Sequence, residues 1–296
     1  MNNLHRELAP ISDGAWAQIE AEASRTLKRH LAARRVVDVR GPQGVALSAV
    51  GTGHVQPLAS PGEGVGAQQR QVQPLVELRV PFELTRQAID DVERGAEDSD
   101  WQPLKDAARS IAFAEDRAVF EGYPAAGIGG VRGGTSNPEI ALPDDPRESP
   151  RAVARAVSQL RLVGVNGPYT LVLGAAAYTD ISEASGYGYP VRRHIERLVD
   201  GEIIWAPGIT GAFVLTSRGG DFALHVGQDV SIGYLSHTEA AVRLYLQETF
   251  TFLLLTQEAA VALTAPGRSG PASAAARTTA AARRASTQRT TRGRRR

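Results

Sequence analysis

The chain has 296 residues with a hydrophobic fraction of 42%, which is ordinary for a folded protein, and it contains no cysteine. The absence of cysteine excludes disulfides and thiolate metal sites, and it is compatible with a reducing cytoplasm. The apolar run at 252–255 is too short to span a bilayer, and the first ten residues include His5, Arg6 and Glu7 instead of the apolar core of a signal peptide. We therefore expect a soluble, cytoplasmic protein without a membrane span.

The net charge of +1 conceals a strong asymmetry between the two ends of the chain. Residues 266–296 contain nine arginines and no acidic residue, and subtracting this charge of +9 leaves −8 for residues 1–265. The other residues of this segment are mostly Ala, Thr, Ser, Gly and Pro, which bury too little apolar surface to fold. We expect a disordered arginine-rich tail with a tendency to bind polyanions.

The first element expected is a helix over 12–31, followed by a short strand over 35–39. Ser12 and Asp13 are suitable cap residues, and apolar side chains then recur at helical spacing. These apolar residues are Trp16, Ile19, Ala23, Leu27 and Leu31.

Residues 45–84 are expected to form two long strands joined by a tip at 60–66, where Gly and Pro dominate. Apolar residues alternate with polar ones along the returning strand, from Val72 to Leu84, as expected when one face of a strand is covered. A two-stranded ribbon of this length is barely stable alone. We therefore expect it to lie on the protein's own core or on a neighbouring subunit.

The centre of the chain is predicted to be helical at first and then to alternate between helices and strands. Thr85 caps a short helix that ends at Gly95, and Ser99 or Asp100 begins a long helix with Pro103 in its first turn. The elements expected next are a glycine-rich connection (122–134), a loop rich in Pro and Asp (138–150), a helix (152–163), a buried strand (169–173), two helices around Tyr178 and Ile195, and a strand (203–205).

The part of the chain before the tail is rich in predicted strands. Residues 212–217 and 221–226 are expected to form a hairpin across a Gly-Gly turn, and two more strands are expected around 231–234 and 242–255. Strands thus lie at both ends of the chain, with an α/β segment between them. This order predicts an α+β fold of two interleaved subdomains.

No group of residues in the sequence points to an active site. The six histidines are scattered without a pair at metal-ligand spacing, and the serine-hydrolase pattern Gly-x-Ser-x-Gly is absent. Adjacent acids occur at Glu115 and Asp116, beside Arg117, and solvent-facing charges or salt bridges between subunits explain them better than paired catalytic carboxylates. We therefore expect no enzymatic activity, no catalytic residue, no metal and no cofactor.

Short sequence motifs are spread in order from residue 1 to about 264. They include Arg-Arg-Val-Val-Asp-Val at 34–39, Ile-Asp-Asp-Val-Glu-Arg-Gly at 89–95, Ile-Ile-Trp-Ala-Pro at 203–207, Ser-Ile-Gly-Tyr at 231–234 and Val-Arg-Leu-Tyr-Leu-Gln-Glu-Thr at 242–249. No single motif is specific, but the ordered set resembles the encapsulins, the linocin-type shell proteins of bacterial nanocompartments, and most of all their actinobacterial members.

The resemblance implies the fold of tailed-bacteriophage major capsid proteins, an α+β fold with a peripheral domain, an axial domain and an extended loop. In this family the extended loop lies across a neighbouring subunit, which would explain the unsupported ribbon. The implied division is a peripheral domain at 1–49, 78–137 and 222–255, an extended loop at 50–77, and an axial domain at 138–221 and 256–265, with the tail at 266–296 outside the family pattern.

The resemblance also implies a function. The chain would be a shell subunit that assembles with copies of itself into an icosahedral cage and encloses a cargo protein through the cargo's C-terminal targeting peptide. A dye-decolorising peroxidase is the expected cargo, with a ferritin-like protein as the next choice. Six residues would form apolar pockets for the peptide, while Arg34 and Asp38 would orient it; alternatively, the six are plain core and the two charges an ordinary surface pair. The six are Leu27, Leu31, Val36, Val230, Ile232 and Tyr234.

A loop of the implied axial domain is expected to line the fivefold channel of the shell, because its residues are small or polar and its glycines give backbone freedom. Some encapsulins bind flavin through a tryptophan at a position that here is Gln87, whose side chain cannot stack on an isoalloxazine ring, so no flavin is expected. The channel residues expected are Glu183, Ser185, Gly186, Tyr187, Gly188 and Tyr189.

Two other functions remain open from the sequence. A phage or prophage major capsid protein would share the fold and package DNA, and a protease or bacteriocin would carry an activity of its own. The extended resemblance and the small size favour the nanocompartment over the phage capsid. The lack of a nucleophile–base arrangement argues against the protease.

Overall fold

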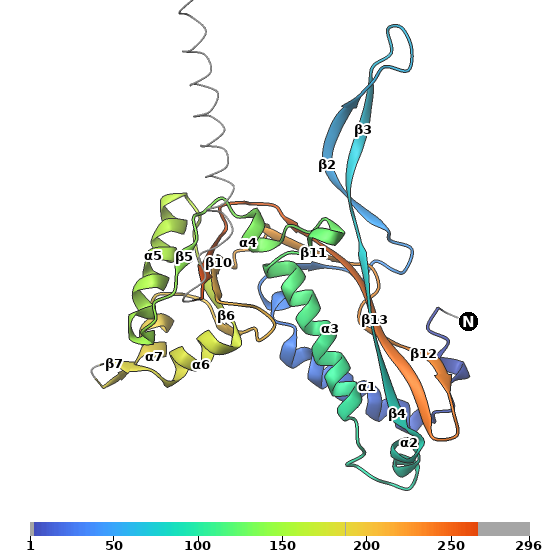
Figure 1. Cartoon of the computed structure of the whole chain (residues 1–296). Helices are drawn as coiled ribbons and strands as arrows, with labels where there is room; N and C mark the ends of the chain where they lie inside the picture. The colour runs from blue at the N-terminus through green and yellow to red at the C-terminus, as the bar shows by residue number, and fades with distance from the viewer. Residues whose placement is uncertain (1–2, 187, 266–296) are drawn as a thin grey trace, which may run out of the picture.

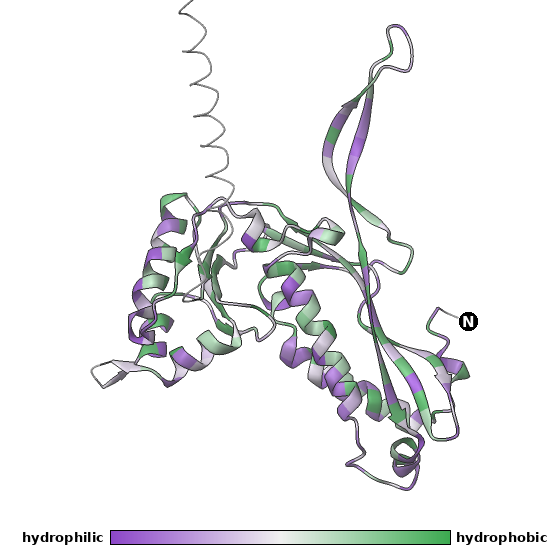
Figure 2. Ribbon diagram, viewed as in Figure 1, coloured by the Kyte–Doolittle hydropathy of each residue, from purple (hydrophilic) through white to green (hydrophobic). Residues whose placement is uncertain are grey.

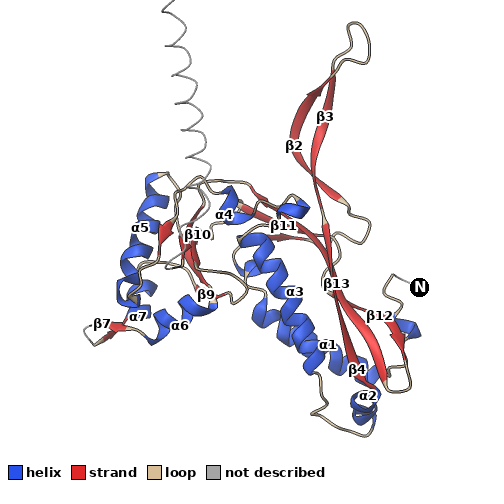
Figure 3. Cartoon of the chain, viewed as in Figure 1, coloured by secondary structure: helices blue, strands red, loops and turns tan. Residues whose placement is uncertain are grey.

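Two five-stranded sheets and a projecting two-stranded ribbon organise the chain (Figure 1). The computed structural model describes residues 3–186 and 188–265, so the tail expected at 266–296 lies outside the described residues. Helices gather along both sheets, and the ribbon stands apart from them (Figure 3). Within the described residues, no helix combines the length and apolar character needed to cross a membrane.

The first sheet is built around β13 (Ala241–Leu254), which pairs with three other strands. β4 (Val76–Thr85) runs antiparallel along one edge of β13. The other edge is shared by β12 (Ser231–His237) and then β11 (Phe222–Val226), both antiparallel to β13. β1 (Asp38–Arg40) extends the sheet parallel to β11.

Three helices pack on the first sheet, and the sequence explains where they begin. α1 (Asp13–His30) follows Ser12, whose Oγ accepts a hydrogen bond from a backbone N–H of the first turn at 3.2 Å. α2 (Arg86–Glu93) follows Thr85 in the same way, and α3 (Gln102–Phe120) begins two residues after Asp100. Buried residues that join these helices to β4, β12 and β13 include Ile19, Leu84, Leu104, Ile111, Leu244 and Leu246.

The second sheet has the strand order β5-β14-β10-β6-β9. Its central strands, β6 (Tyr169–Leu173) and β10 (Ala212–Thr216), are antiparallel neighbours, and every residue in them is buried. Continuous burial means that both faces are covered: Leu171 faces a core shared with helices, whereas Val172 faces the core shared with the first sheet. The other strands of this sheet are β5 (Ile140–Ala141), β9 (Ile203–Trp205) and β14 (Ala260–Thr264). Four further helices are α4 (Gly130–Gly134), α5 (Ser149–Leu162), α6 (Ala175–Glu183) and α7 (Val191–Glu196).

The ribbon consists of β2 (Ala49–Leu58) and β3 (Ala67–Pro74), which are antiparallel and leave the body of the molecule (Figure 1). Most of its residues are exposed, and hydrophobic residues occur among the hydrophilic ones along its length (Figure 2). Val55 and Val72, for example, are 49% and 55% exposed. The ribbon therefore presents apolar side chains that no described part of its own chain covers.

The strand expected over 35–39 is wrong in position. Ala33–Arg35 form a turn of 3₁₀ helix, and the strand begins only at Asp38. Asp116 on α3 explains the turn, because its carboxylate accepts hydrogen bonds from the amides of Ala32 (3.2 Å) and Ala33 (2.8 Å). A contact between residues this far apart in the sequence cannot be inferred from local apolar spacing.

The single returning strand expected from Val72 to Leu84 is interrupted at Leu75. β3 pairs with β2 and β4 pairs with β13, so the alternating segment serves two different sheets. Accordingly, Val72 is exposed whereas Phe82 and Leu84 are buried. The apolar alternation is the same in both halves, but among the described residues only β4 has a face that the rest of the chain covers.

The hairpin expected from 212–217 and 221–226 is also wrong, because β10 belongs to the second sheet and β11 to the first. Gly219 and Gly220 both have positive φ, and the Gly220 amide donates a hydrogen bond to the Asp38 carboxylate at 2.6 Å. This turn directs the chain from one sheet to the other. Two apolar strands around a Gly-Gly pair give the same sequence pattern whether they pair or separate.

Candidate functional site

A groove of about 600 Å³ lies between α1 and the start of β12. Leu27 and Leu31 are four residues apart, on one face of α1 and its C-terminal cap, and they line the groove with Val230 and Ile232. Leu4 lines it as well, and its carbonyl accepts a hydrogen bond (2.8 Å) from the backbone of β12. Because Ile232 is only 6% exposed, the floor of the groove is apolar and continuous with the core.

Charged residues surround this groove. Arg6 forms an ion pair with Glu20 at 2.5 Å, and Arg35 forms one with Glu202 at 2.5 Å. Lys28 is exposed and forms no ion pair with any residue of the described ranges. Exposed ion pairs contribute about 0–1 kcal/mol, so a polar group of a ligand could replace one of these partners at little cost.

Arg34 lies at the edge of the groove, but most of its guanidinium is directed into the protein. Its Nε donates to both carboxylate oxygens of Glu115 at 2.9 Å, and its Nη2 contacts Glu115 at 2.5 Å and Glu248 at 3.2 Å. Its Nη1 donates to the half-exposed Asp229 at 2.7 Å. The side chains of Glu115 and Glu248 are fully buried. Arg34 therefore compensates two interior carboxyl groups and offers only one edge to the groove.

Burial shifts the pKa values of two carboxyl groups near Arg34, those of Glu248 and Asp116. Burial raises the pKa of Glu248 well above its ordinary value, and the negative charge of Glu115 acts in the same direction. Burial likewise raises the pKa of Asp116 to about 7, although hydrogen bonds from the Ala33 and Ala32 amides act to lower it. The Oε1 atom of Glu248 has no hydrogen-bond partner within the described part of the chain. We call Arg34, Glu115, Asp116, Asp229 and Glu248 the Arg34 cluster.

The expectation of solvent-facing charges at Glu115 and Asp116 is wrong, because both residues are completely buried on α3. Glu115 is compensated by Arg34, and Asp116 by backbone amides at the end of α1. The pair therefore connects α3 to the segment that carries the groove. The sequence around Glu115 and Asp116 does not indicate that they are buried, because Arg34 and the amides that compensate them lie about 80 residues earlier in the chain.

Five of the eight residues expected to bind a peptide line this one groove: Leu27, Leu31, Arg34, Val230 and Ile232. The other three lie elsewhere. Val36 is buried in the core, and Asp38 lines a separate, smaller pocket with it. Tyr234 is half-buried and its hydroxyl contacts His237 Nδ1 at 2.6 Å. Arg34 and Asp38 thus neither pair with each other nor flank the same groove.

Several groove residues were not expected from the sequence. Leu4 and Arg6 precede the first helix, where no periodic pattern marks a buried side chain, so no local signal could have found them. Ala23 could have been included, because it precedes Leu27 by one helical turn and lies on the same face.

The segment expected to line a channel forms a small hairpin between α6 and α7. Its strands are β7 (Ser185–Gly186) and β8 (Tyr189–Pro190), and it projects from the end of the molecule that carries the second sheet (Figure 1). Tyr189 contacts the ring of His194 with centroids 5.0 Å apart. Tyr187 lies outside the described residues. This hairpin therefore lies away from the groove, since it connects α6 to α7 whereas the groove lies between α1 and β12 (Figure 1).

Neither a flavin nor a metal ion was expected from the sequence. Gln87 is an exposed residue of the first turn of α2. Over residues 3–186 and 188–265, no three His, Cys, Asp or Glu side chains are grouped so that they could hold a metal ion.

Comparisons with known proteins identify the family. The family described as encapsulating protein for peroxidase matches residues 1–251. Type 1 encapsulin shell proteins of Rhodococcus erythropolis and Mycobacterium tuberculosis are 63% and 60% identical over 263 residues, which is 89% of this chain and 100% and 99% of those proteins. The one of Rhodospirillum rubrum is 48% identical over 270 residues, 89% of this chain and 96% of its own length.

Solved structures show the fold. The virus-like particle protein of Pyrococcus furiosus aligns with a TM-score of 0.60 at 15% identity, covering 83% of this chain and 98% of that one. The structure of Gordonia phage Cozz aligns with a TM-score of 0.53 at 11% identity, covering 81% and 87%. The α+β phage-capsid fold expected from the sequence is confirmed, whereas identities this low carry no information on function. The much higher identity to shell proteins does, and the chain belongs to the type 1 encapsulin shell proteins, a family of structural cage subunits and not of enzymes.

Proposed function

We propose that the chain is the repeating subunit of an icosahedral shell, located in the cytoplasm, that encloses a cargo enzyme. The observation that carries this proposal is the ribbon of β2 and β3, which exposes Val55, Leu58 and Val72 away from the body. Covering one half-exposed side chain of this kind stabilises by on the order of 1 kcal/mol. A neighbouring subunit would supply that cover, and repetition of the contact would build a closed shell.

The proposal assigns a role to each part of the fold. The first sheet with α1 to α3 corresponds to the peripheral domain (1–49, 78–137 and 222–255), the ribbon to the extended loop (50–77), and the second sheet with α5 to α7 to the axial domain (138–221 and 256–265). The long β13, which crosses most of the first sheet, gives the peripheral domain a rigid axis from which the ribbon extends through β4.

The groove between α1 and β12 suits an extended targeting peptide. Leu27, Leu31 and Ile232 offer apolar contacts, and the backbone of β12 offers hydrogen bonds. The Tyr234 amide points away from β13, toward the Leu4 carbonyl. Residues two apart in a strand direct their backbone groups to the same edge, so the N–H and C=O of Ile232 also face outward. A peptide could therefore bind by strand addition, with alternate side chains in the apolar floor.

The cargo we propose is a peroxidase, since the family description names an encapsulating protein for peroxidase. A dye-decolorising peroxidase with a C-terminal targeting peptide is the first candidate, and a ferritin-like protein is the second. Any oxidoreductase or iron-storage activity of the particle would belong to that cargo.

Two further roles follow from the same proposal. The segment 183–190, which runs from the last residue of α6 through the hairpin of β7 and β8, would line a channel at a symmetry axis, because it projects from the axial part of the subunit (Figure 1). The tail at 266–296, with nine arginines and no acid, would bind polyanions such as nucleic acid.

Assembly is the property that tests the proposal most directly. Purified protein is expected to elute as particles of megadalton mass, measured by light scattering, and to form round, hollow shells in electron micrographs. A stable monomer or dimer under native conditions would contradict the proposal.

A further inference from the structure

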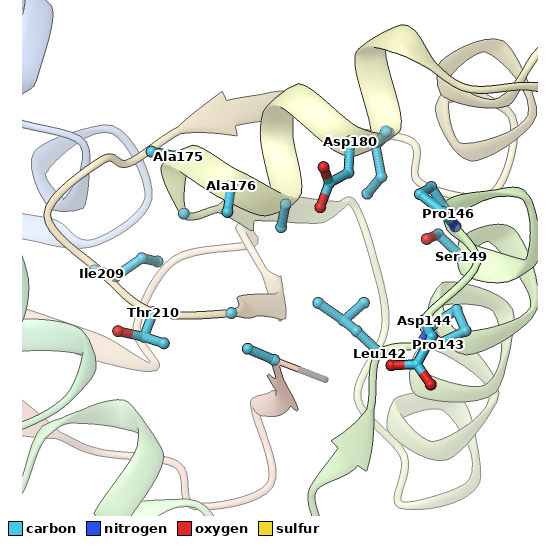
Figure 4. A pocket seen from close by; sticks show the side chains of 15 residues that line it. Leu142, Pro143, Asp144, Pro146, Ser149, Ala175, Ala176, Asp180, Ile209 and Thr210 are labelled. Atoms are coloured by element: carbon cyan, nitrogen blue, oxygen red, sulfur yellow. The ribbon is translucent and has the colours of Figure 1, made fainter. Parts of the chain in front are cut away.

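A pocket of about 260 Å³ beside the second sheet belongs neither to the groove nor to the hairpin (Figure 4). Leu142 and Ile209 reach into it from opposite sides, and the first turn of α6 forms another part of its wall. Asp180 points toward the pocket from α6, and Asp144 lies near Leu142 (Figure 4). The pocket is therefore apolar inside and carries two carboxylates at its rim.

The described chain ends in the wall of this pocket, because Ala265 is one of the residues that line it. Gly211 makes this possible: its φ is +73°, and a Cβ there would lie 2.3 Å from the carbonyl oxygen of Leu263. Only glycine allows the start of β10 to approach the end of β14 so closely. The Gly174 amide, at the start of α6, donates to the Gly211 carbonyl at 2.9 Å and joins the same corner. The chain beyond Ala265 therefore starts at the pocket.

The two carboxylates at the rim are unpaired within the described residues. The side chains of Asp144 and Asp180 are exposed and take no part in an ion pair there, whereas the adjacent Asp145 is paired with Arg147 at 2.7 Å. Two carboxylates around an apolar interior suit a cation on an apolar stem, and an arginine side chain has both parts. The start of α6 carries a partial positive charge, but this is about half a charge against two full negative ones.

We propose that this pocket is the docking site of the chain's own segment 266–268, with the Arg268 guanidinium between Asp144 and Asp180. Arg268 is the third residue after Ala265, and three residues span at most about 10 Å. Of the nine tail arginines it is therefore the one that the chain holds nearest to the rim. The other eight remain available to polyanions, so this docking does not depend on the proposed shell function.

A spin label tests the docking, because the chain has no cysteine and accepts a single labelled site. In full-length protein, a nitroxide on Ser269→Cys lies next to Arg268, and one on Ser286→Cys lies far along the tail. We expect a slow-motion component in the electron paramagnetic resonance spectrum at position 269 and none at position 286.

Substitutions at the rim then assign the slow component to the pocket. Asp144→Asn combined with Asp180→Asn should weaken docking roughly tenfold, because two exposed ion pairs are lost, and the slow component should disappear. Glu148→Gln removes a nearby exposed charge that does not line the pocket and should leave the component unchanged. A fast-motion spectrum at position 269 in the parent protein, or a slow component that survives both asparagine substitutions, would overturn the proposal.

Discussion

Most hydrogen bonds of the Arg34 guanidinium go to buried carboxylates and not to the groove. The family resemblance implies that Arg34 orients a bound peptide, but its Nε and Nη2 atoms are occupied by Glu115 and Glu248 inside the protein. Replacing Arg34 by alanine would leave a buried carboxylate without its partner, which costs about 3–5 kcal/mol. Reduced cargo loading in such a variant would report damage to the fold as well as loss of binding. Tests of the groove are better placed on residues that only line it.

Leu31→Asp is such a test, because Leu31 is half-buried at the end of α1 and faces the groove. A carboxylate at this position would be desolvated by a bound peptide, at a cost of a few kcal/mol, which is enough to abolish a micromolar interaction. We expect intact shells that contain almost no cargo when the variant is co-expressed with the candidate peroxidase. The measurement is the ratio of cargo to shell protein in purified particles.

The matched control is Ala21→Asp, which adds the same charge to an exposed position of α1 that does not line the groove. Cargo loading should be unchanged in this variant. Normal loading of Leu31→Asp would remove the groove from consideration as the peptide site.

Asp116 should make stability depend on pH. Burial raises its pKa from 3.8 to about 7, so between these values the folded protein holds a proton that the unfolded chain has lost. The stabilisation is complete below about pH 4 and is lost as the pH rises toward 7. Three pH units correspond to about 4 kcal/mol. Asp116→Asn keeps an oxygen acceptor and cannot ionise, so the fall in unfolding temperature between pH 4 and pH 8 should become shallower.

The same measurement on two further variants identifies the source of the effect. Burial raises the pKa of Glu248 in the same direction, so Glu248→Gln should also reduce the pH dependence. The exposed Asp90→Asn should leave it as in the parent protein. An unchanged slope in Asp116→Asn would show that its carboxyl group does not titrate over this range.

Among the elements, the ribbon makes the clearest prediction about assembly. Val55→Asp combined with Val72→Asp places two charges where a neighbouring subunit should cover apolar side chains, at a cost on the order of 3 kcal/mol per site. We expect shells to be lost, as judged by light scattering, while far-UV circular dichroism of the subunit stays unchanged. Gln71→Glu adds a charge to an exposed polar position of β3 and should permit assembly. Shells formed by the double variant would show that the ribbon is not an interface.

Local patterns predicted most elements, and the exceptions share one cause. Side-chain caps at Ser12 and Thr85 and the continuous apolar run at β6 gave correct helices and a correct strand, because each signal is contained in a few neighbouring residues. The strand expected over 35–39 and the hairpin across Gly219 failed because contacts with Asp116 and Asp38 decide the local conformation there. Those partners are distant in sequence.

The groove was assigned from the family resemblance, and local sequence patterns account for only part of it. Leu27 and Leu31 follow a helical period and Ile232 lies in a strand-like segment, which agrees with their positions on the groove that the resemblance implied. The family resemblance implied that Val36 and Asp38 belong to the peptide site, but they follow the 3₁₀ turn at Ala33–Arg35 and line a separate pocket. The burial of Glu115 and Glu248 depends on Arg34 and could not be read from either segment alone.

At the scale of the whole molecule, the proposed channel role of the hairpin of β7 and β8 can be tested by deletion. Deleting residues 185–188 removes β7 and the turn to β8 without touching either five-stranded sheet. If it lines a channel, the deletion should leave shells intact and speed the entry of a small probe to an enclosed peroxidase, measured as the rate of substrate oxidation at low substrate concentration. An unchanged rate would indicate that small molecules enter elsewhere.

Residues 266–296 carry a charge of +9, opposite in sign to the −8 of residues 1–265. Removing residues 269–296 takes away eight arginines and retains Arg268 for the pocket beside α6. Shells should still form, because the family match ends at residue 251. The nucleic acid that co-purifies with them, measured by the absorbance ratio at 260 and 280 nm, should fall.

In the parent protein this nucleic acid should also dissociate steeply with salt, because each neutralised phosphate contributes a slope of about −0.7 to −0.9 in log K against log salt. A tail of the same length with those eight arginines changed to glutamine separates charge from length and should behave like the truncated protein. If both variants retain nucleic acid at the parent level, the tail is not the polyanion site. If truncation alone prevents assembly, the segment contributes to the shell through contacts other than charge.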